Sequence, residues 1–280
     1  MAHDEAPINS YDLPLAYYKL PATSLVDTHC HLDLEAFEQD REAMLERARA
    51  AGVNRMLVPA TDLASSRRAV ALAEQHAALR AAVGVHPNEA GNFTTETLAE
   101  LRDLAQHPKV DAIGEIGIDL YWHTVALEKQ QHAFRAQLEL AAELGRPAII
   151  HDREAHAEVM AELGETRVPA GVVLHSFSGD SAMAEQAVAA GYYLGVDGPL
   201  TYKKNDGLRD IFRKAPRDCI LIETDAPYLT PQARRGTRNE PAYVRFVAEK
   251  LAEVRASTFE MVAAATTANA ARLFRWELAQ

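Results

Sequence analysis

Short apolar runs alternate with longer segments of helical periodicity along this chain, and this alternation limits the possible folds more than any other feature. Eight runs are predicted strands: Leu25–His29, Val53–Val58, Arg80–Val85, Ala112–Glu115, Pro147–His151, Gly171–His175, Tyr192–Val196 and Cys219–Asp225. Strands rich in Val, Ile and Leu that are each followed by a helix form a parallel sheet with helices on its outer face. Eight such units predict an α/β protein with a (β/α)8 TIM-type barrel. An open doubly wound sheet is the alternative.

The length of the chain and its helical segments agree with one barrel. The chain has 280 residues, and a barrel of this type has about 250. The helix that contains Phe134, Leu138 and Ala141 is expected to end at Gly145, which suits a left-handed C-cap. We predict an N-terminal extension over residues 1–24 and a single barrel domain over residues 25–280.

Composition and charge exclude several classes of protein. Two cysteines, Cys30 and Cys219, are too few for a disulfide framework and predict a reducing, cytoplasmic location. No apolar run approaches the roughly 20 residues that span a bilayer, so no membrane association is expected. The net charge of −11 disfavours a protein whose whole surface binds duplex DNA. A nucleic-acid substrate would have to be attracted locally, by bound metal and a few basic loops.

Histidine and carboxylate side chains lie at or near the carboxyl ends of the predicted strands. His29 and His31 are two residues apart in an extended segment, so both imidazoles face the same way. Four more candidates share this placement: Glu115, His151, His175 and Asp225. Active sites of such barrels form at this end. Four imidazoles and two carboxylates buried together need a cation to neutralise them, so we predict a metal site.

Six ligands exceed the three protein ligands of a typical catalytic zinc and predict two divalent metal ions. The assignment places two groups on either side of a bridge: His29, His31 and Asp225 on one metal, His151 and His175 on the other, and Glu115 on both. Such a pair, about 3.5–4 Å apart, can hold a bridging hydroxide and clamp an attacked oxygen. Glu115 and Asp225 are therefore the expected catalytic residues, with Asp225 as the base. Nitrogen-rich ligands suit Zn, Mn, Fe or Ni better than Mg, and the identity stays open.

Basic residues gather near the same predicted strand ends on an otherwise acidic chain. Arg153 lies two residues beyond His151, and the loop of residues 230–238 carries three arginines, among them Arg235 and Arg238. These side chains are the expected substrate contacts and favour an anionic substrate such as a phosphodiester. Solvated surface charge is the alternative for each of them.

Two further pairs of residues have open interpretations. Asp27 and Glu223 lie two residues before His29 and Asp225, so they are expected one layer deeper, where they would position the ligands or serve as ordinary hydrogen-bonded core groups. Tyr121 and Trp122 follow the fourth strand, and they would either stack on a nucleobase or pack as part of a lid.

The motifs of this chain resemble those of the TatD-type metal-dependent deoxyribonucleases, a family within the amidohydrolase-like barrels. The matching stretches are Asp27–His31, Gly84–Pro87, Gly114–Asp119, His151–Arg153, His175–Gly179, Glu223–Leu229, Arg238–Pro241 and Asn269–Phe274. The resemblance implies a metallo-dependent hydrolase barrel, two divalent metals held by the six ligands named above, and 3′-to-5′ exonuclease activity on DNA. It also implies that His86 contacts a substrate phosphate or a further metal.

We therefore expect a divalent-metal-dependent hydrolase that removes nucleotides from single-stranded or frayed DNA ends, with no obligate protein partner. A metal-dependent amide or ester hydrolase of a small molecule is the alternative that uses the same hydroxide. A non-catalytic, metal-dependent nucleic-acid binder is a third possibility, and it predicts tight DNA binding without turnover.

Overall fold

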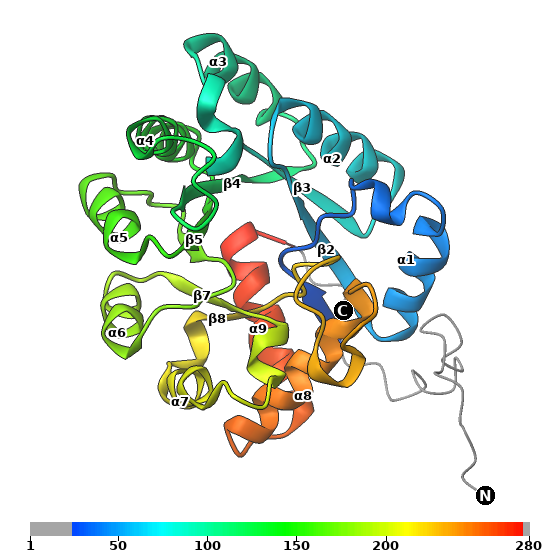
Figure 1. Ribbon diagram of the computed structural model, residues 1–280. Coiled ribbons are helices and arrows are strands. Elements are labelled where there is room, and N and C mark those ends of the chain that lie inside the picture. The colour runs from blue at the N-terminus through cyan, green and yellow to red at the C-terminus, as the bar shows by residue number, and fades with distance from the viewer. Residues whose placement is uncertain (1–23, 277–280) are drawn as a thin grey trace, which may run out of the picture.

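The structure is a computed structural model that describes residues 24–276, and within them eight parallel strands form one sheet in the order β1-β2-β3-β4-β5-β6-β7-β8 (Figure 1). The strands are β1 (Leu25–Asp27), β2 (Val53–Pro59), β3 (Leu79–Val83), β4 (Val110–Asp119), β5 (Ala148–Arg153), β6 (Val172–Leu174), β7 (Tyr193–Val196) and β8 (Ile220–Ile222). Every predicted strand is present with different boundaries, and the TIM-type barrel is confirmed.

Helices surround the strands on the outside of the barrel, and the last of them lies across one end of it (Figure 1). They are α1 (Arg41–Ala50), α2 (Leu63–Gln75), α3 (Thr95–Leu104), α4 (Leu127–Leu144), α5 (His156–Glu165), α6 (Ser181–Ala189), α7 (Asp206–Lys214), α8 (Val244–Val254) and α9 (Phe259–Phe274). Short 3-10 helices lie in the loops: η2 (Glu35–Phe37), η3 (Pro87–Asn92), η4 (Gly198–Thr201), η5 (Arg217–Cys219), η6 (Gln232–Arg234) and η7 (Pro241–Tyr243). The predicted cap of α4 is confirmed, because Gly145 adopts a left-handed conformation with φ of 61°.

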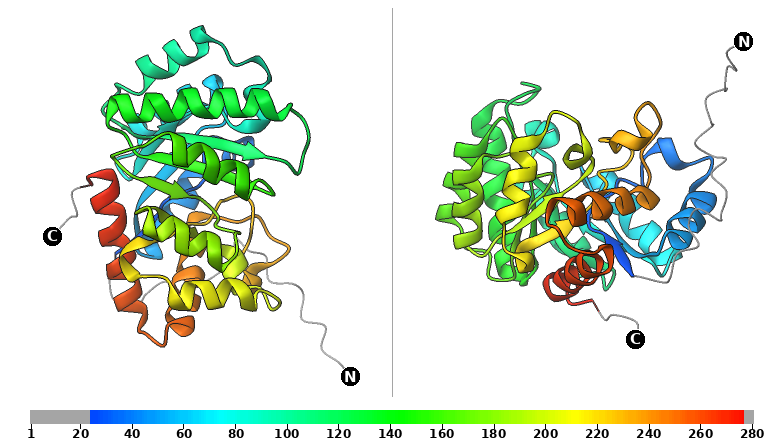
Figure 2. Two further views of the ribbon diagram at one scale, coloured as in Figure 1. Left: turned by 90° about the vertical axis from the view of Figure 1, so that its left-hand side faces the viewer. Right: turned by 90° about the horizontal axis from the view of Figure 1, so that it is seen from below.

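Helix α9 closes the amino end of the barrel. Successive side chains of a strand point to opposite faces, and one inward-facing residue from each of seven strands belongs to the same buried cluster as the C-terminal half of α9. These residues are Val26, Leu57, Ala82, Ala112, Ile149, Val173 and Leu221. Both views of Figure 2 place α9 at the end of the barrel opposite the loop that follows β8. The other end of the barrel is therefore the one available for a site.

Strand β4 does not end at Glu115, so that part of the prediction is wrong. It continues to Asp119, and all ten of its residues are buried. Between the paired positions Ile113–Ala148 and Ile116–Ile150, two residues of β4 lie opposite one residue of β5, which is a bulge. A Cβ on Gly114 would lie 2.7 Å from Ile149 Cβ, and one on Gly117 would lie 2.0 Å from the His151 carbonyl oxygen. These two glycines therefore allow close contact with β5, which a sequence pattern of apolar residues does not reveal.

Hydrogen bonds between the segments after β1 and β8 bring the two ends of the sheet together. Thr28 N donates to Ile222 O at 3.2 Å, Asp225 N to His29 O at 2.9 Å, and His31 N to Ala226 O at 2.8 Å. The segments that follow the first and the last strand of the sheet are thereby held side by side, although nearly 200 positions separate them in sequence.

Buried ion pairs join α1 to the loop after β8. The Arg47 guanidinium donates to both oxygens of Glu240, at 2.7 to 3.0 Å, and to Asp40 at 2.9 Å. Arg238 donates to the same Asp40 carboxylate at 2.8 and 2.9 Å. The side chain of Glu240 is 5% exposed, so removing Arg47 leaves a buried charge whose other cation, Arg238, is 3.9 Å away.

Replacing Arg47 with methionine is expected to lower the free energy of unfolding by about 3 kcal/mol, because Glu240 then stays buried without its bidentate partner. Urea denaturation measures this loss, with the slope of the unfolding free energy against urea concentration expected to be unchanged. Arg49→Met is the matched control, because Arg49 is 76% exposed and pairs with an exposed Glu46. That variant is expected to change stability by less than about 0.5 kcal/mol. Equal losses in both variants would contradict a structural role for the buried pair.

Two further expectations concern the N-terminal residues and membrane-spanning helices. Residues 1–23 lie outside them, so the N-terminal extension and the domain division stay predictions. Within residues 24–276, no helix combines the length and the apolar composition that crossing a bilayer requires.

Candidate metal centre

The structure brings all six predicted ligands together at the carboxyl end of the barrel. Five of them line a cavity of about 920 Å³: His31, Glu115, His151, His175 and Asp225. His29 is fully buried beneath this cavity. The site therefore combines a buried cluster of donor atoms with an open space above it that a substrate can enter.

Four donor atoms from three parts of the chain face one point. His29 Nε2 lies 3.2 Å from His31 Nε2, 3.3 Å from Glu115 Oε2 and 3.8 Å from Asp225 Oδ1. His31 Nε2 lies 3.5 Å from Glu115 Oε2 and 3.4 Å from Asp225 Oδ1. In a tetrahedral zinc site with bonds of 2.0–2.1 Å, ligand atoms are about 3.3 to 3.4 Å apart. The observed separations suit such a set of ligands.

The second oxygen of Glu115 faces the other predicted group. Glu115 Oε1 lies 2.7 Å from His151 Nδ1 and 3.8 Å from His175 Nε2. His175 Nε2 is also 3.8 Å from Asp225 Oδ1. One carboxylate thus contacts imidazoles from both groups, which is the arrangement expected of a bridging ligand.

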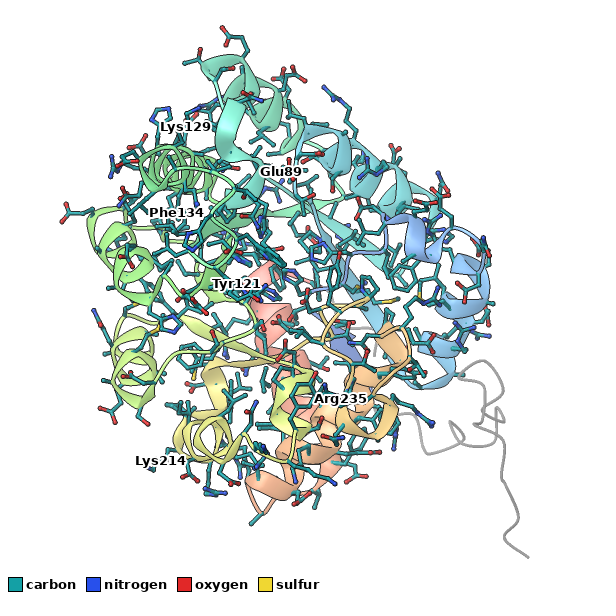
Figure 3. All side chains as sticks on the ribbon, in the orientation of Figure 1. Glu89, Tyr121, Lys129, Phe134, Lys214 and Arg235 are labelled. Atoms are coloured by element: carbon teal, nitrogen blue, oxygen red, sulfur yellow. The ribbon has the colours of Figure 1, made fainter. Side chains whose placement is uncertain are left out.

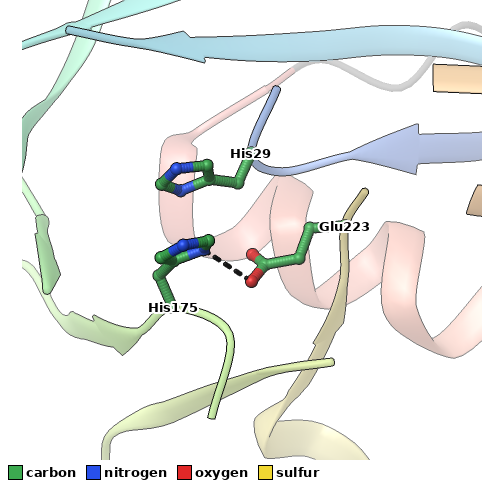
Figure 4. Close-up of side chains that lie close together, drawn as sticks. All are labelled: His29, His175 and Glu223. Atoms are coloured by element: carbon green, nitrogen blue, oxygen red, sulfur yellow. Dashed lines mark hydrogen bonds and ion pairs between the residues drawn. The ribbon is translucent and has the colours of Figure 1, made fainter. Parts of the chain in front are cut away.

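Glu223 holds the imidazole of His175 in place, as Figure 4 shows. Its Oε1 lies 2.8 Å from His175 Nδ1, which assigns a proton to Nδ1 and leaves Nε2 facing the cluster. The rings of His29 and His175 stack with centroids 3.4 Å apart. Asp27 instead accepts hydrogen bonds from Thr224 Oγ1 at 2.6 Å and from the backbone of His29 at 3.2 Å, so it supports the backbone of the site.

The electrostatic surroundings raise the pKa of His31, His151 and His175 and so favour positive charge on them, whereas burial lowers the pKa of His29. Burial opposes ionisation of Glu115, but His29 and His151 outweigh it and hold its pKa well below its usual range. Burial also opposes protonation of His151, yet Asp119 and Glu115 raise its pKa to about 9. Glu223 similarly overcomes burial and raises the pKa of His175 to about 10. A divalent cation would experience the same favourable field.

The ring nitrogens of His29 and His31 provide a further test of whether these residues suit a metal. The two facing Nε2 atoms of His29 and His31 are too close for both to carry a proton. Their Nδ1 atoms are buried and have no hydrogen-bond partner among the described residues. A cation bound between the two Nε2 atoms would accept both of their lone pairs, while each Nδ1 lies on the far side of its ring. Groups of His, Asp and Glu with this spacing can hold metal ions.

Asp119 belongs to the site although it is not among the ligands predicted from the sequence. Its Oδ2 lies 3.0 Å from His151 Nε2, opposite the contact of that ring with Glu115. Burial raises the pKa of Asp119, but hydrogen bonds outweigh this effect and lower it to about 2. An acidic residue at the end of an apolar run was the signal that selected Asp225, and it would have selected Asp119 had the true end of β4 been known.

His86 and Arg153 both line the cavity, where the sequence analysis placed them. His86 follows β3 and accepts a hydrogen bond from Asn88 N through Nδ1 at 3.1 Å. Its Nε2 lies 3.8 Å from Glu115 Oε1. Burial and the neighbouring His151 lower the pKa of His86 to about 3, so the ring is neutral and can donate one hydrogen bond. Arg153 lies at the end of β5 with its guanidinium over the Tyr121 ring.

The two arginines predicted after β8 are directed toward protein groups. Arg238 donates to Asp40 and to the carbonyl oxygen of Ala36 at 2.5 Å. Arg235 lies over the Tyr202 ring, with 4.7 Å between its Cζ and the ring centroid. Figure 3 shows Arg235 on the segment after β8. Neither is among the described residues that line the 920 Å³ cavity, so their contact with substrate stays a prediction.

Comparisons with known proteins agree with this geometry. The family model described as TatD related DNase matches residues 26–275. An uncharacterized metal-dependent hydrolase of Bacillus subtilis, YabD, is 42% identical over 252 residues, which are 90% of this chain and 99% of the relative. A Cronobacter turicensis protein named 3′-5′ ssDNA/RNA exonuclease TatD is 40% identical over 257 residues, 89% of this chain and 97% of the relative.

A solved structure has the same architecture. The crystal structure of YjjV, a TatD homologue from Escherichia coli, superimposes with a TM-score of 0.87 at 36% identity and covers 91% of this chain and 100% of that one. The similarity therefore extends over the whole barrel and includes the segments that carry the donor cluster.

Proposed function

Because this chain belongs to the family of TatD-related DNases, metal-dependent hydrolases that act on ester bonds, we propose that it is a 3′-to-5′ exonuclease of single-stranded or frayed DNA ends. The observation that carries the proposal is the six-residue donor cluster beneath a cavity of about 920 Å³. The name of the Cronobacter relative supports the polarity and the single-stranded substrate. We also propose that residues 25–280 form a single hydrolase domain and that the protein is cytoplasmic.

We propose that two divalent metal ions bind here, with His29, His31, Glu115, His151, His175 and Asp225 as ligands. The donor separations and the negative surroundings described above support this assignment. Bound cations would lower the pKa of the attacking water and polarise a phosphoryl oxygen. The chain itself supplies the geometry, because Glu115 and Glu223 hold three of the imidazoles at fixed positions.

Three residues facing the cavity have roles in the proposed reaction. Burial raises the pKa of Asp225, but His31, His175 and His29 outweigh it and lower the pKa, so the group is ionised at neutral pH and can accept a proton from water. Neutral His86 can donate a hydrogen bond to a phosphate oxygen. Arg153 supplies positive charge on the rim, opposite in sign to the DNA backbone.

A degradation assay with end-labelled DNA tests the proposal. A single-stranded 20-mer with a 5′ label is expected to give a ladder that retains the label and shortens stepwise from the 3′ end when the protein is loaded with Mn²⁺ or Zn²⁺. A blunt duplex is expected to react more slowly, because its terminal bases must unpair. An RNA of the same sequence in the same assay shows whether the second substrate in the Cronobacter name applies here.

The control is the Asp225→Asn variant prepared in parallel, which excludes a contaminating nuclease. Absence of shortening with Mn, Mg, Zn and Ni would contradict the exonuclease. Hydrolysis of a small ester or amide under those conditions would instead support the small-molecule hydrolase, and tight DNA binding without turnover would support the non-catalytic binder.

A further inference from the structure

Exposed aromatic side chains are concentrated at the catalytic end of this barrel. Four large apolar side chains are exposed among the described residues: Tyr121 (44%), Trp122 (56%), Tyr228 (55%) and Met261 (49%). Trp122 and Tyr228 line the 920 Å³ cavity, and the Tyr228 ring lies 6.2 Å from that of His31. In Figure 3, Tyr121 appears near the middle of the ring of strands. Large aromatic groups left in water beside a reaction site indicate a ligand that covers them.

Tyr121, Trp122 and Arg153 form a packed group, which we call the aromatic rim. The Arg153 Cζ lies 3.9 Å from the Tyr121 ring centroid and 5.5 Å from that of Trp122. The two rings meet edge to face, with centroids 4.9 Å apart. The described ion pairs include none for Arg153, so its charge is available to a ligand.

The aromatic rim is fixed to the candidate metal centre through Asp119. The backbone amides of Tyr121 and Trp122 donate to Asp119 Oδ1 at 2.9 and 3.1 Å. The other oxygen of this carboxylate contacts His151 at 3.0 Å. Asp119 and Arg153 are also paired positions of β4 and β5. The rim therefore lies at a set position relative to the donor cluster, as a substrate subsite requires.

We propose that the aromatic rim is a nucleobase-binding subsite, on which the base next to the scissile phosphate stacks on Trp122 while Arg153 contacts the adjoining phosphate. The subsite rests on the exonuclease function proposed above. Aromatic faces bind bases of any sequence, and a nearby arginine adds attraction to the backbone. In a duplex both faces of an internal base are covered by its neighbours, whereas the base of an unpaired end is open. The subsite would therefore make the enzyme select unpaired ends without selecting sequence.

Intrinsic fluorescence of the metal-loaded protein gives a direct binding measurement, because the chain has two tryptophans. Trp276 is 7% exposed and packs on Phe274 at the closed end of the barrel, so it lies away from substrate. Phosphorothioate-linked dT8, which resists hydrolysis, is expected to quench wild-type emission saturably. An abasic strand of equal length and charge is expected to leave it unchanged. Trp122→Phe, which retains Trp276, is expected to lose the quenching but bind dT8 with similar affinity.

Fluorescence anisotropy of 5′-labelled strands measures the contribution of stacking. Trp122→Ala is expected to raise the Kd for dT8 by about 5- to 150-fold, the range for loss of one base-stacking contact. Its Kd for the abasic strand is expected to stay within about twofold of wild type. Arg153→Gln is expected to reduce the slope of log Kd against log salt concentration by about 0.7, the value for one single-strand phosphate contact.

Met261→Ala is the matched control, because it removes a side chain of similar exposure near the amino end of β8 and is expected to bind like wild type. The subsite would be overturned if Trp122→Ala bound dT8 as tightly as the wild-type protein does. It would also be overturned if the wild-type protein bound the abasic strand as tightly as it binds dT8. If either result accompanied 3′ shortening of DNA, the exonuclease would stand without the subsite. A wild-type protein that neither binds nor shortens any strand would overturn both.

Discussion

Replacing Glu115 with glutamine is expected to lower kcat by at least about 10³-fold and metal affinity by more than tenfold. The physical reason is that its two oxygens serve different imidazoles, with Oε2 3.3 Å from His29 and Oε1 2.7 Å from His151. An amide of the same shape carries no charge and presents N–H donors where acceptors are needed. Because Glu115 is 2% exposed, water cannot replace the lost contact.

Metal content by plasma mass spectrometry and turnover of end-labelled DNA measure the two effects separately. Glu260→Gln makes the same change at an exposed position of α9, on the closed end of the barrel, and is expected to retain full activity. A Glu115→Gln protein with wild-type metal content and wild-type kcat would refute the bridging role of this carboxylate.

The Asp225→Asn variant is expected to lose about 10³- to 10⁴-fold in kcat while its fold is unchanged. Asp225 has a φ of 55°, a left-handed conformation in which asparagine is well tolerated. The substitution therefore removes the charge and the proton acceptor without straining the backbone. The side chain faces the cavity and is 13% exposed, so its carboxylate can reach a water molecule above the donor cluster.

Steady-state kinetics on single-stranded DNA checks this loss, and circular dichroism with a melting temperature checks the fold. Asp225→Ala serves as a comparison, because alanine is disfavoured at this φ and adds a backbone cost of about 1–2 kcal/mol. The asparagine variant should therefore melt close to wild type, whereas the alanine variant should melt lower. Substantial activity in a correctly folded Asp225→Asn protein would exclude Asp225 as the base.

Periodicity in the sequence was sufficient to predict the barrel, because strand and helix patterns depend on residues that are close along the chain. The spacing of Phe134, Leu138 and Ala141 before Gly145 predicted α4 and its left-handed cap, and both are present. The two-residue spacing of His29 and His31 predicted that they face one way, and their Nε2 atoms lie 3.2 Å apart. Such predictions need only the geometry of a strand or a helix turn.

Features that depend on contacts between distant segments were missed or placed differently. The bulge in β4 depends on how Gly114 and Gly117 meet β5, and it moved the end of that strand from Glu115 to Asp119. Arg238 looked available for substrate in sequence, but Asp40, almost 200 residues earlier, pairs with it. No local pattern contains information on either contact.

Hydrophobic periodicity and strand parity act locally, so the fold class, the end of the barrel that carries the candidate site and the residue types that gather there could be predicted from the sequence alone. The tertiary structure was needed to establish which donor atoms face one another, that Asp119 contacts both the candidate metal centre and the aromatic rim, and which arginines are directed at the cavity. Those outcomes depend on strand register and loop packing, in which residues far apart in the chain compete for the same partners.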